Sequence, residues 1–474
     1  MLQYAARRVL WMFPTFFLIS MIVFALINLA PGDPGAAAGG ANNAQQASST
    51  SSTSVAAWRL TNGLARPVVL NTRPWWTTEE VRTWIVTADA LEGTPTPAQR
   101  IAAKDTLTDG GNYLVRHLVA LLQDPSPQVR SAALSWLPIA ARRPFERDPR
   151  NDPAIAEQNR SIDAFNQVFR EWRCSGADPA CEATMMGNWT TWWAEQRDGY
   201  EYSTLESVAA LVLDTRFALY WARILTLDCG NSYLNGEAIC PVVAEKMKYS
   251  VSLSLTSVLL AYLIAVPLGV YSAVRSGSRG DVVVTVGLFI LYSLPTFFTG
   301  TVLLQLLSQG TPFEWFPRGD FQSRYPPATT LGQLADVAWH LALPVATSTS
   351  VALAALSRYA RAGVIDVIRA DYIRTARAKG LEEPVVIIKH AVRNGMIPIL
   401  TLLGGILPVL VSGNVVVEVV FNIPGMGQYL FESIGNRDYN AVMAVLLASA
   451  GLTLVGILLS DLSYALADPR ISLD

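Results

Sequence analysis

The stretch RYARAGVIDVIRADYIRTARAKGL, residues 358–381, decides the fold, and KHAVRNGMIPIL continues it over residues 389–400. Its apolar residues recur at intervals of three or four, which predicts one helical stripe continuing from the preceding apolar segment. The stripe consists of Ile365, Ile368, Tyr372 and Ala376. Gly380 then predicts the end of a short helix and a turn, because glycine readily adopts the left-handed backbone that such turns use.

The same stretch is also strongly basic. Eight Lys or Arg residues lie between Arg358 and Arg393, and long apolar segments lie on both sides. Cytoplasmic loops of membrane proteins carry an excess of Lys and Arg. We therefore expect this loop to face the cytoplasm. A basic loop that only fixes topology or touches anionic lipid is the alternative interpretation.

The overall composition supports a membrane protein. Of the 474 residues, 51% are hydrophobic and only 16% are charged, and the mean hydropathy is +0.29. Soluble domains carry about 25% charged residues. The net charge of −2 excludes a typical nucleic-acid-binding protein, which would be clearly basic.

Six segments are apolar over about 20 residues, the length that a helix needs to cross a bilayer. They are residues 9–30, 249–274, 282–307, 337–356, 396–417 and 441–466. A cleaved signal peptide is the alternative for the first, but its apolar run exceeds the roughly 7–15 residues of such a core. We expect a retained anchor. With a cytoplasmic amino terminus, six spans place the basic loops and the carboxy terminus in the cytoplasm.

Between the first two spans the sequence changes character twice. Residues 35–57 are a low-complexity linker of Ala, Gly, Asn, Gln, Ser and Thr, which cannot bury a core. Residues 58–207 are expected to form an inserted α-helical domain, because ten of the thirteen Trp residues lie between Trp58 and Trp221. These Trp residues suit either a core or a partner surface. Thr77 and Glu80 predict a helix start by the capping-box pattern, and residues 121–134 resemble one HEAT-type repeat.

Several motifs resemble one family of membrane proteins. They are LINLAPGDP at residues 26–34, ALYWARILTLDCGNSY at 218–233, RTARAKG at 374–380, VVVEVVFNIPGMG at 415–427 and DLSYALADPR at 461–470. Together they resemble the membrane subunits of ABC importers, in particular the B-type permeases for dipeptides, oligopeptides or nickel. The family's loop motif has Glu and Ala where this chain has Arg374 and Thr375, a departure that the peptide branch shares.

The resemblance implies an all-α membrane protein with the type I importer permease fold. Residues 1–34 would be the cytoplasmic amino terminus and first span, and residues 208–474 the permease core with five spans. The function implied is ATP-driven import of peptides or a related small solute across the bacterial inner membrane. The implied partners are a second homologous permease, two ATPase subunits, an extracytoplasmic binding protein and the lipid bilayer, with no nucleic acid.

The resemblance also assigns a role to the basic loop. In the family, its short helix docks on an ATPase subunit and transmits ATPase closure to the membrane helices. The residues expected to carry this coupling are Asp371, Tyr372, Arg374, Thr375, Ala376, Lys379 and Gly380.

Catalytic motifs are missing from the sequence. There is no GxxxxGK[ST] phosphate loop, so we expect a subunit that is not an enzyme, binds no cofactor and leaves ATP to its partners. His117, His340 and His390 are too scattered to predict a metal site, and each is interpreted as a surface or interfacial residue.

Polar and helix-breaking residues inside the spans are candidates for the translocation path. They are Ser293, Pro295 and Thr296 in the third span, Asn414 in the fifth and Glu418 at its outer end. Such residues usually face a cavity or a protein partner. A packing kink with interfacial capping is the alternative. The cargo stays open between a peptide, nickel, a glycoside and another solute.

All four cysteines fall on the expected extracytoplasmic side: Cys174, Cys181, Cys229 and Cys240. An even number in an oxidising compartment favours disulfides. Three pairings exist, and the one that closes the shortest loops joins Cys174 to Cys181 and Cys229 to Cys240. Four free buried thiols are the alternative.

Two other classes of protein compete with the importer. An ion-coupled secondary transporter would leave the basic loop unexplained, and the spans lack a charged midplane pair. A membrane-anchored interaction scaffold would not need six spans.

Overall fold

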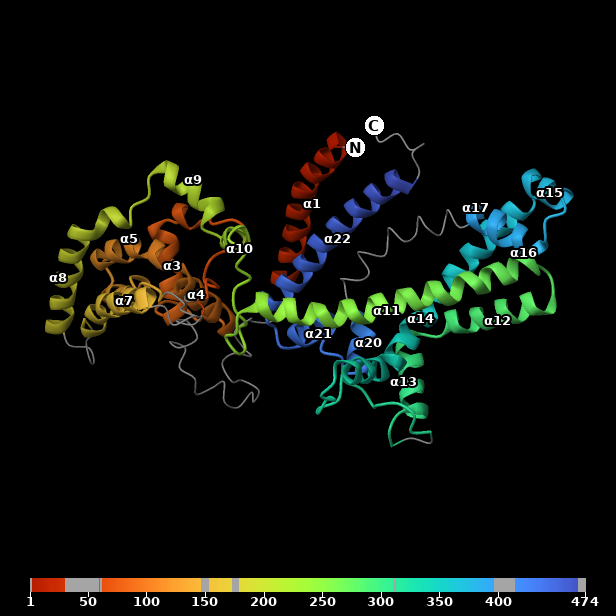
Figure 1. Ribbon diagram of the computed structural model, residues 1–474. Helices are drawn as coiled ribbons and strands as arrows, with labels where there is room; N and C mark the ends of the chain where they lie inside the picture. The colour runs from red at the N-terminus through yellow and green to blue at the C-terminus, as the bar shows by residue number, and fades with distance from the viewer. Residues whose placement is uncertain are drawn as a thin grey trace. The chain divides into compact units, whose positions relative to one another are not determined.

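The structure is a computed structural model that describes residues 2–29, 59, 62–145, 153–172, 179–310, 313–395 and 414–467. Across these ranges it is helical, and the β pairing found there consists of two isolated bridges, Asn231 with Ala238 and Ser308 with Phe316. The helical class expected from the sequence is confirmed. The chain forms two compact units, residues 1–23 with 239–474 and residues 24–238 (Figure 1). The expected linker, residues 35–57, lies outside the described residues.

The first unit, which we call the membrane unit, contains the apolar helices. Its helices are α1 (Leu2–Leu29, shared with the second unit), α11 (Ile239–Val274), α12 (Arg279–Ser293), α13 (Thr296–Leu307), α14 (Thr330–Ile368), α15 (Asp371–Ala378), α16 (Glu383–Val385), η4 (Val386–Val392), α17 (Arg393–Gly395), α20 (Val415–Val420), α21 (Met426–Gly435) and α22 (Tyr439–Ala467).

Several of these helices are suited to cross a bilayer. Four are long and apolar enough: Ala6–Leu29, Ile239–Val274, Thr330–Ile368 and Tyr439–Leu459. The pair α12 and α13 makes a fifth if it is counted as one span, bent by 99°. The span expected at residues 396–417 falls mostly outside the described residues, so the count of six stays a prediction.

The bend between α12 and α13 occurs where the sequence is interrupted. Pro295 lacks a backbone N–H and cannot continue the hydrogen bonding of α12, and α13 begins at Thr296. The hydroxyl of Ser293 donates to the carbonyl oxygen of Phe289 at 2.8 Å, which satisfies it within its own helix. The interruption expected in the third span is therefore present.

Small residues bring α11 and α14 into close contact. Ala261, Ala265 and Gly269 recur every four residues on α11, and all three are buried. A Cβ atom on Gly269 would lie 2.6 Å from the carbonyl oxygen of Ser357 on α14. Small residues drive helix packing in a bilayer because lipid offers no hydrophobic force between helices. The pair α11–α14 is the centre of the membrane unit.

The second unit, residues 24–238, is a helical domain, which we call the helical unit. Its helices are α3 (Thr78–Asp89), α4 (Pro97–Gly110), α5 (Asn112–Ala120), α6 (Pro127–Ala140), α7 (Pro153–Glu171), α8 (Pro179–Gln196), α9 (Thr204–Leu213) and α10 (Arg216–Leu225), with 3-10 turns at Arg73–Trp75, Leu121–Gln123 and Arg197–Gly199. The capping box is confirmed: Thr77 N–H donates to Glu80 Oε2 at 2.8 Å, and Glu80 N–H donates to Thr77 Oγ1 at 3.3 Å. A HEAT-type identity stays a prediction.

Aromatic side chains fill part of this core. Trp189 is fully buried and its ring stacks on Phe169 with centroids 5.0 Å apart. Trp172 and Trp192 pack edge-on against Trp189 at 5.2 and 5.3 Å. For these Trp residues, the core interpretation is therefore correct.

The helical unit extends beyond residue 207, where the sequence placed the end of the insertion. The backbone N–H of Asn71 donates to the carbonyl oxygen of Leu211 at 2.9 Å, and that of Arg216 donates to Pro67 at 2.9 Å. The hydroxyl of Tyr113 donates to Asp214 at 2.7 Å. These bonds tie residues 211–216 to the start of the domain, so α9 and α10 belong to the compact unit. The division at 58–207 stays a prediction.

We expect the helical unit to lose stability in mild acid because of His117. Its imidazole is 7% exposed, and burial together with neighbouring Arg116 lowers its pKa to about 4. The unfolded chain takes up this proton below about pH 6.5, whereas the folded unit stays neutral, so stability falls as the pH drops from 6.5 toward 4. The loss is about 2 kcal/mol or less between pH 7 and pH 5.

Hydrogen exchange of α5 amides in the full chain, corrected for intrinsic rates, measures this loss. His117→Gln should reduce the pH dependence. Equal pH dependence in both proteins would contradict the role of His117.

Candidate functional site

The basic loop folds into a short helix, α15, set apart from α14. Helix α14 ends at Ile368, Ala370 is extended at φ −70° and ψ 150°, and α15 begins at Asp371. The expected single stripe through Tyr372 is therefore wrong, because the extended residue breaks the hydrogen bonding and rotates the next turn. Ile373 and Ala376 face inward instead, at 0% and 7% exposure, and Tyr372 is 44% exposed.

The turn after α15 depends on Gly380, as expected. Its φ is +75°, the left-handed region that glycine adopts without strain. Its N–H donates to the carbonyl oxygen of Arg377 at 2.9 Å, and the N–H of Leu381 donates to that of Ala376 at 3.4 Å. Nothing lies within 4 Å of a Cβ built on Gly380. The backbone conformation, and not crowding, therefore selects glycine here.

The buried face of α15 packs against an apolar cluster formed by η4 and the end of α14. Ile373 and Ala376 form a buried cluster with Val386 and Ala391 of η4, and Val367 and Ile368 from the end of α14 pack against it. The hydroxyl of Tyr372 accepts from the Nδ2 amide of Asn394 at 3.0 Å. Close-packed apolar contacts of this kind transmit movement because they are hard to compress. Helix α15 and the end of α14 should thus move together.

An ion pair closes the turn that follows α15. Arg377 contacts Glu383 through two bonds, Nε to Oε2 at 3.1 Å and Nη2 to Oε1 at 2.6 Å. The bonds from Arg377 lower the pKa of the Glu383 carboxyl. Both side chains are exposed, so the pair adds little stability. The bidentate contact between Arg377 and Glu383 does fix the direction of the chain after the turn.

The opposite face of α15 is polar and open. The side chains of Asp371 and Arg374 are 97% and 75% exposed, and Thr375 and Lys379 are exposed beside them. The structure thus brings the seven expected coupling residues together on one short helix and its turn. One of them, Ala376, anchors the helix, and the charged ones face outward. This arrangement suits docking on another protein.

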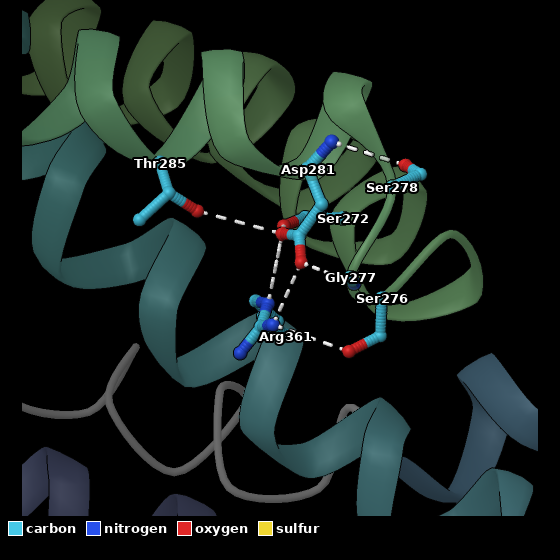
Figure 2. A network of polar contacts seen from close by, with 7 residues as sticks. All are labelled: Ser272, Ser276, Gly277, Ser278, Asp281, Thr285 and Arg361. Atoms are coloured by element: carbon cyan, nitrogen blue, oxygen red, sulfur yellow. Dashed lines mark hydrogen bonds and ion pairs between the residues drawn. The ribbon is translucent and has the colours of Figure 1, made fainter.

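A second polar cluster lies next to this site and was not found from the sequence (Figure 2). Arg361 of α14 contacts Asp281 of α12 through Nη2–Oδ2 at 2.9 Å and Nε–Oδ1 at 3.2 Å. Ser272 of α11 also donates to Asp281 and accepts from Arg361 Nε at 3.1 Å. The backbone N–H of Gly277 donates to Asp281 at 2.9 Å. This cluster joins three helices.

The position of Arg361 connects this cluster to α15. Arg361 lies on the same continuous helix as Val367 and Ile368, on which α15 rests. Its side chain is 36% exposed, whereas that of Asp281 is 7% exposed. The sequence offered one signal, the SxxD start of α12, in which Ser278 accepts from the backbone of Asp281 at 3.3 Å. The packing of α11, α12 and α14 decides which basic residue of the loop pairs with Asp281.

Of the expected path residues, Asn414 and Glu418 lie together. The Glu418 carboxylate is fully buried and accepts from Ser250 Oγ at 2.8 Å, from Asn414 N–H at 3.1 Å and from Gln428 N–H at 3.0 Å. A Cβ on Gly425 would lie 2.5 Å from this carboxylate, which explains the glycine. Ser293, Pro295 and Thr296 are not among these partners and lie at the bend between α12 and α13.

The cysteines of the described region are oxidised. Cys181, Cys229 and Cys240 are each disulfide-bonded, and Cys174 lies outside the described residues. The pairing stays a prediction. The three histidines lie on α5, α14 and η4, and His117 is buried, which contradicts the surface interpretation of that residue. Among the described residues, no three His, Cys, Asp or Glu side chains are grouped to hold a metal ion.

Removal of Arg361 should destabilise the membrane unit. Arg361→Ala leaves the Asp281 carboxylate without its cation, and because the Arg361 side chain is 36% exposed we expect a loss of about 1–3 kcal/mol, the cost of leaving a polar group without its partner. Arg358→Ala, an exposed position one turn earlier, is the matched control. Thermal unfolding of the purified chain should show a clear loss for the first variant and almost none for the second.

Adding Asp281→Asn to Arg361→Ala should recover part of the loss, because it removes the unpaired charge. If the Arg361→Ala chain unfolds at the same temperature as the Arg358→Ala chain, the ion pair does not hold these helices.

Comparisons with known proteins place this geometry in a family. The family model of the binding-protein-dependent transport system inner membrane component matches residues 265–473, which include α12, α14, α15 and the Glu418 loop. The match begins inside α11, after the helical unit has ended.

Individual relatives agree. The chain is 38% identical over 245 residues to the oligopeptide transport system permease protein AppB of Bacillus subtilis, covering 52% of this chain and 76% of that protein. It is 34% identical over 261 residues to the glutathione transport system permease protein GsiC of Pectobacterium atrosepticum, covering 55% and 79%. It is 32% identical over 262 residues to the peptidoglycan transport system permease protein YejB of Agrobacterium fabrum, covering 55% and 72%.

These relatives are permease subunits and not enzymes, and they replace the secondary-transporter and scaffold interpretations of the sequence. The matched residues include the apolar helices α12, α13, α14 and α22 and the short helix α15 of the basic loop. The chain belongs to the family of binding-protein-dependent transport system inner membrane components and is a permease subunit of an ABC importer.

Proposed function

We propose that this permease imports peptides or a related small solute together with four kinds of partner. These are a second homologous permease subunit, two ATPase subunits, an extracytoplasmic binding protein and the surrounding bilayer. Relatives named for oligopeptide and glutathione transport support a peptide cargo. The ATPase subunits use ATP, and this chain binds no cofactor.

The observation that carries the proposal is the construction of α15. Its charged face is open at Asp371 and Arg374, while Ile373 and Ala376 fix it to the end of α14. A partner that binds the open face and moves it also moves α14, because the apolar contacts between them are close-packed. The Arg361–Asp281 contact then extends the movement to α11 and α12. A rigid lever of this kind suits a transporter with two discrete states.

The membrane topology that we propose has six spans with both termini in the cytoplasm. Four long apolar helices and the bent pair α12–α13 account for five spans, and residues 396–417 supply the sixth. Basic residues in the loops at 275–279 and 358–393 favour a cytoplasmic position for both loops. The helical unit then lies on the extracytoplasmic side.

The translocation path that we propose follows the bend between α12 and α13. A break at membrane depth is tolerated where the helix faces water or protein, and Ser293, Pro295 and Thr296 occupy this break. Asn414 caps α20 by accepting from Val417 N–H at 3.3 Å. We assign Asn414 and Glu418 to the wall of the path, with Glu418 holding the Gly425–Gly427 loop in place.

The extracytoplasmic position also suits oxidised cysteines. We propose the pairs Cys174–Cys181 and Cys229–Cys240, which close the shortest loops. Disulfide bonding of Cys181, Cys229 and Cys240 supports this.

Gly380→Pro should abolish coupling without preventing membrane insertion. Proline fixes φ near −65° and removes the N–H that bonds to Arg377, so transport should fall at least about tenfold. Gly380→Asn is the matched control, because Asn tolerates a positive φ and a Cβ meets no atom there. Solute uptake and ATP hydrolysis are measured with the reconstituted importer.

In the proline variant, we expect ATP hydrolysis to become independent of the solute and its binding protein. Full uptake by Gly380→Pro at normal protein abundance would contradict the coupling role of this turn.

Reporter fusions test the topology separately. Fusions after Arg279 and Lys389 should report the cytoplasm, and fusions after Ala57 and Arg318 should report the opposite side. A single discordant fusion would require a different number of spans.

A further inference from the structure

Helix α9 of the helical unit has its large apolar side chains on the outside. Leu205, Val208, Val212 and Leu213 are 80%, 54%, 56% and 68% exposed. Spacings of three, four and one place them on one face of the helix. The opposite, buried face carries Ser207 and Ala210. A helix on the surface of a soluble domain shows the reverse pattern, so the exposed face of α9 needs an apolar environment.

The exposed face is held rigidly. Ser203 and Glu206 form a capping box at the start of α9, with Ser203 N–H donating to Glu206 Oε2 at 2.8 Å. Near its end, the Leu211 carbonyl accepts from Asn71 N–H at 2.9 Å. This bond also places Leu70, 59% exposed, beside the helix. The apolar surface is therefore a fixed feature of the unit.

Contacts within the helical unit tie α10 to the last turns of α1. After Asp214 and Thr215 the chain enters α10. The ring centroids of Phe217 and Tyr220 on this helix lie 5.3 and 6.1 Å from that of Phe24. Arg216 Nη1 donates to Asn28 Oδ1 at 3.4 Å. Phe24 and Asn28 belong to the last turns of α1, a helix that is apolar and long enough to span the membrane. Helix α9 thus ends two residues before α10, the helix that contacts the last turns of α1.

We propose that α9 lies in the surface of the bilayer, with Leu205, Val208, Val212 and Leu213 inserted among the lipids of the leaflet at which α1 ends. Lipid is the occupant because the end of α1 brings the bilayer surface to α10, and the two-residue connection keeps α9 close to it. Helices with one apolar face bind membranes in this way, at the boundary of headgroups and acyl chains. The contact would hold this face of the helical unit at the membrane surface.

The test places the photo-crosslinking amino acid p-benzoylphenylalanine at position 208 of the full chain, reconstituted with its partner subunits in phospholipid vesicles. The matched control carries it in place of Ile101, an apolar residue of α4 in the same unit that is 61% exposed. After irradiation, mass spectrometry identifies the adducts. We expect phospholipid adducts at position 208 to exceed those at position 101 by at least about tenfold.

Two results would overturn the proposal. One is an adduct at position 208 with another subunit or a second copy of this chain in place of lipid. The other is a lipid yield at position 208 no greater than at position 101. If the position 208 chain does not fold, the same pair of measurements is made at position 212. Intact disulfides and unchanged thermal unfolding establish that each chain is folded.

Discussion

The close approach of α11 and α14 is the constraint on which the membrane unit depends. In a bilayer, apolar side chains gain little by leaving lipid for protein, so contact between backbones has to supply the attraction. Gly269 allows it, because any side chain there would collide with Ser357. The Thr349 hydroxyl adds a bond to the Ser257 carbonyl oxygen at 3.1 Å. Helices α12, α13, α20, α21 and α22 each contact at least one member of this pair.

Polar contacts then secure the two helices at different points. At one, Arg361 of α14 and Ser272 of α11 meet Asp281 of α12. At another, Ser250 of α11 meets Glu418 and the loop that follows it. Each buried carboxylate accepts several bonds, as a charge removed from water requires. The packed pair therefore has polar attachments on which a partner's movement can act, and α15 rests on the end of one of its two helices.

The helical unit follows a different physical rule, because its core is built like that of a soluble domain. Trp189 and Phe169 are buried together, and Leu114 and Leu118 are fully enclosed. Helix α9 differs from this core, because its small residues face inward and its large apolar residues face outward. The same unit thus combines an apolar core with one surface helix whose large apolar side chains are exposed.

The sequence by itself determined the helical class, several long apolar helices, the Thr77 capping box and the turn at Gly380. Each of these depends on residues close together in the chain, which is why local patterns predict them. The RTARAKG motif also pointed to the residues that the structure brings together on α15 and its turn. The break at Ala370, by contrast, was hidden by a periodic pattern that continues across it.

Only the tertiary structure decided which charges meet. Arg361 and Asp281 are 80 residues apart, and Ser250 and Glu418 are 168 apart. Nothing in the local sequence distinguishes Arg361 from Arg358, one turn away. The same holds for α9: which of its faces is buried depends on the contacts with Asn71 and Tyr113 that fix residues 211–214. A sequence pattern records the spacing of residues along one helix. Which charged side chains pair, and which face of a helix is buried, depends on how separate helices pack.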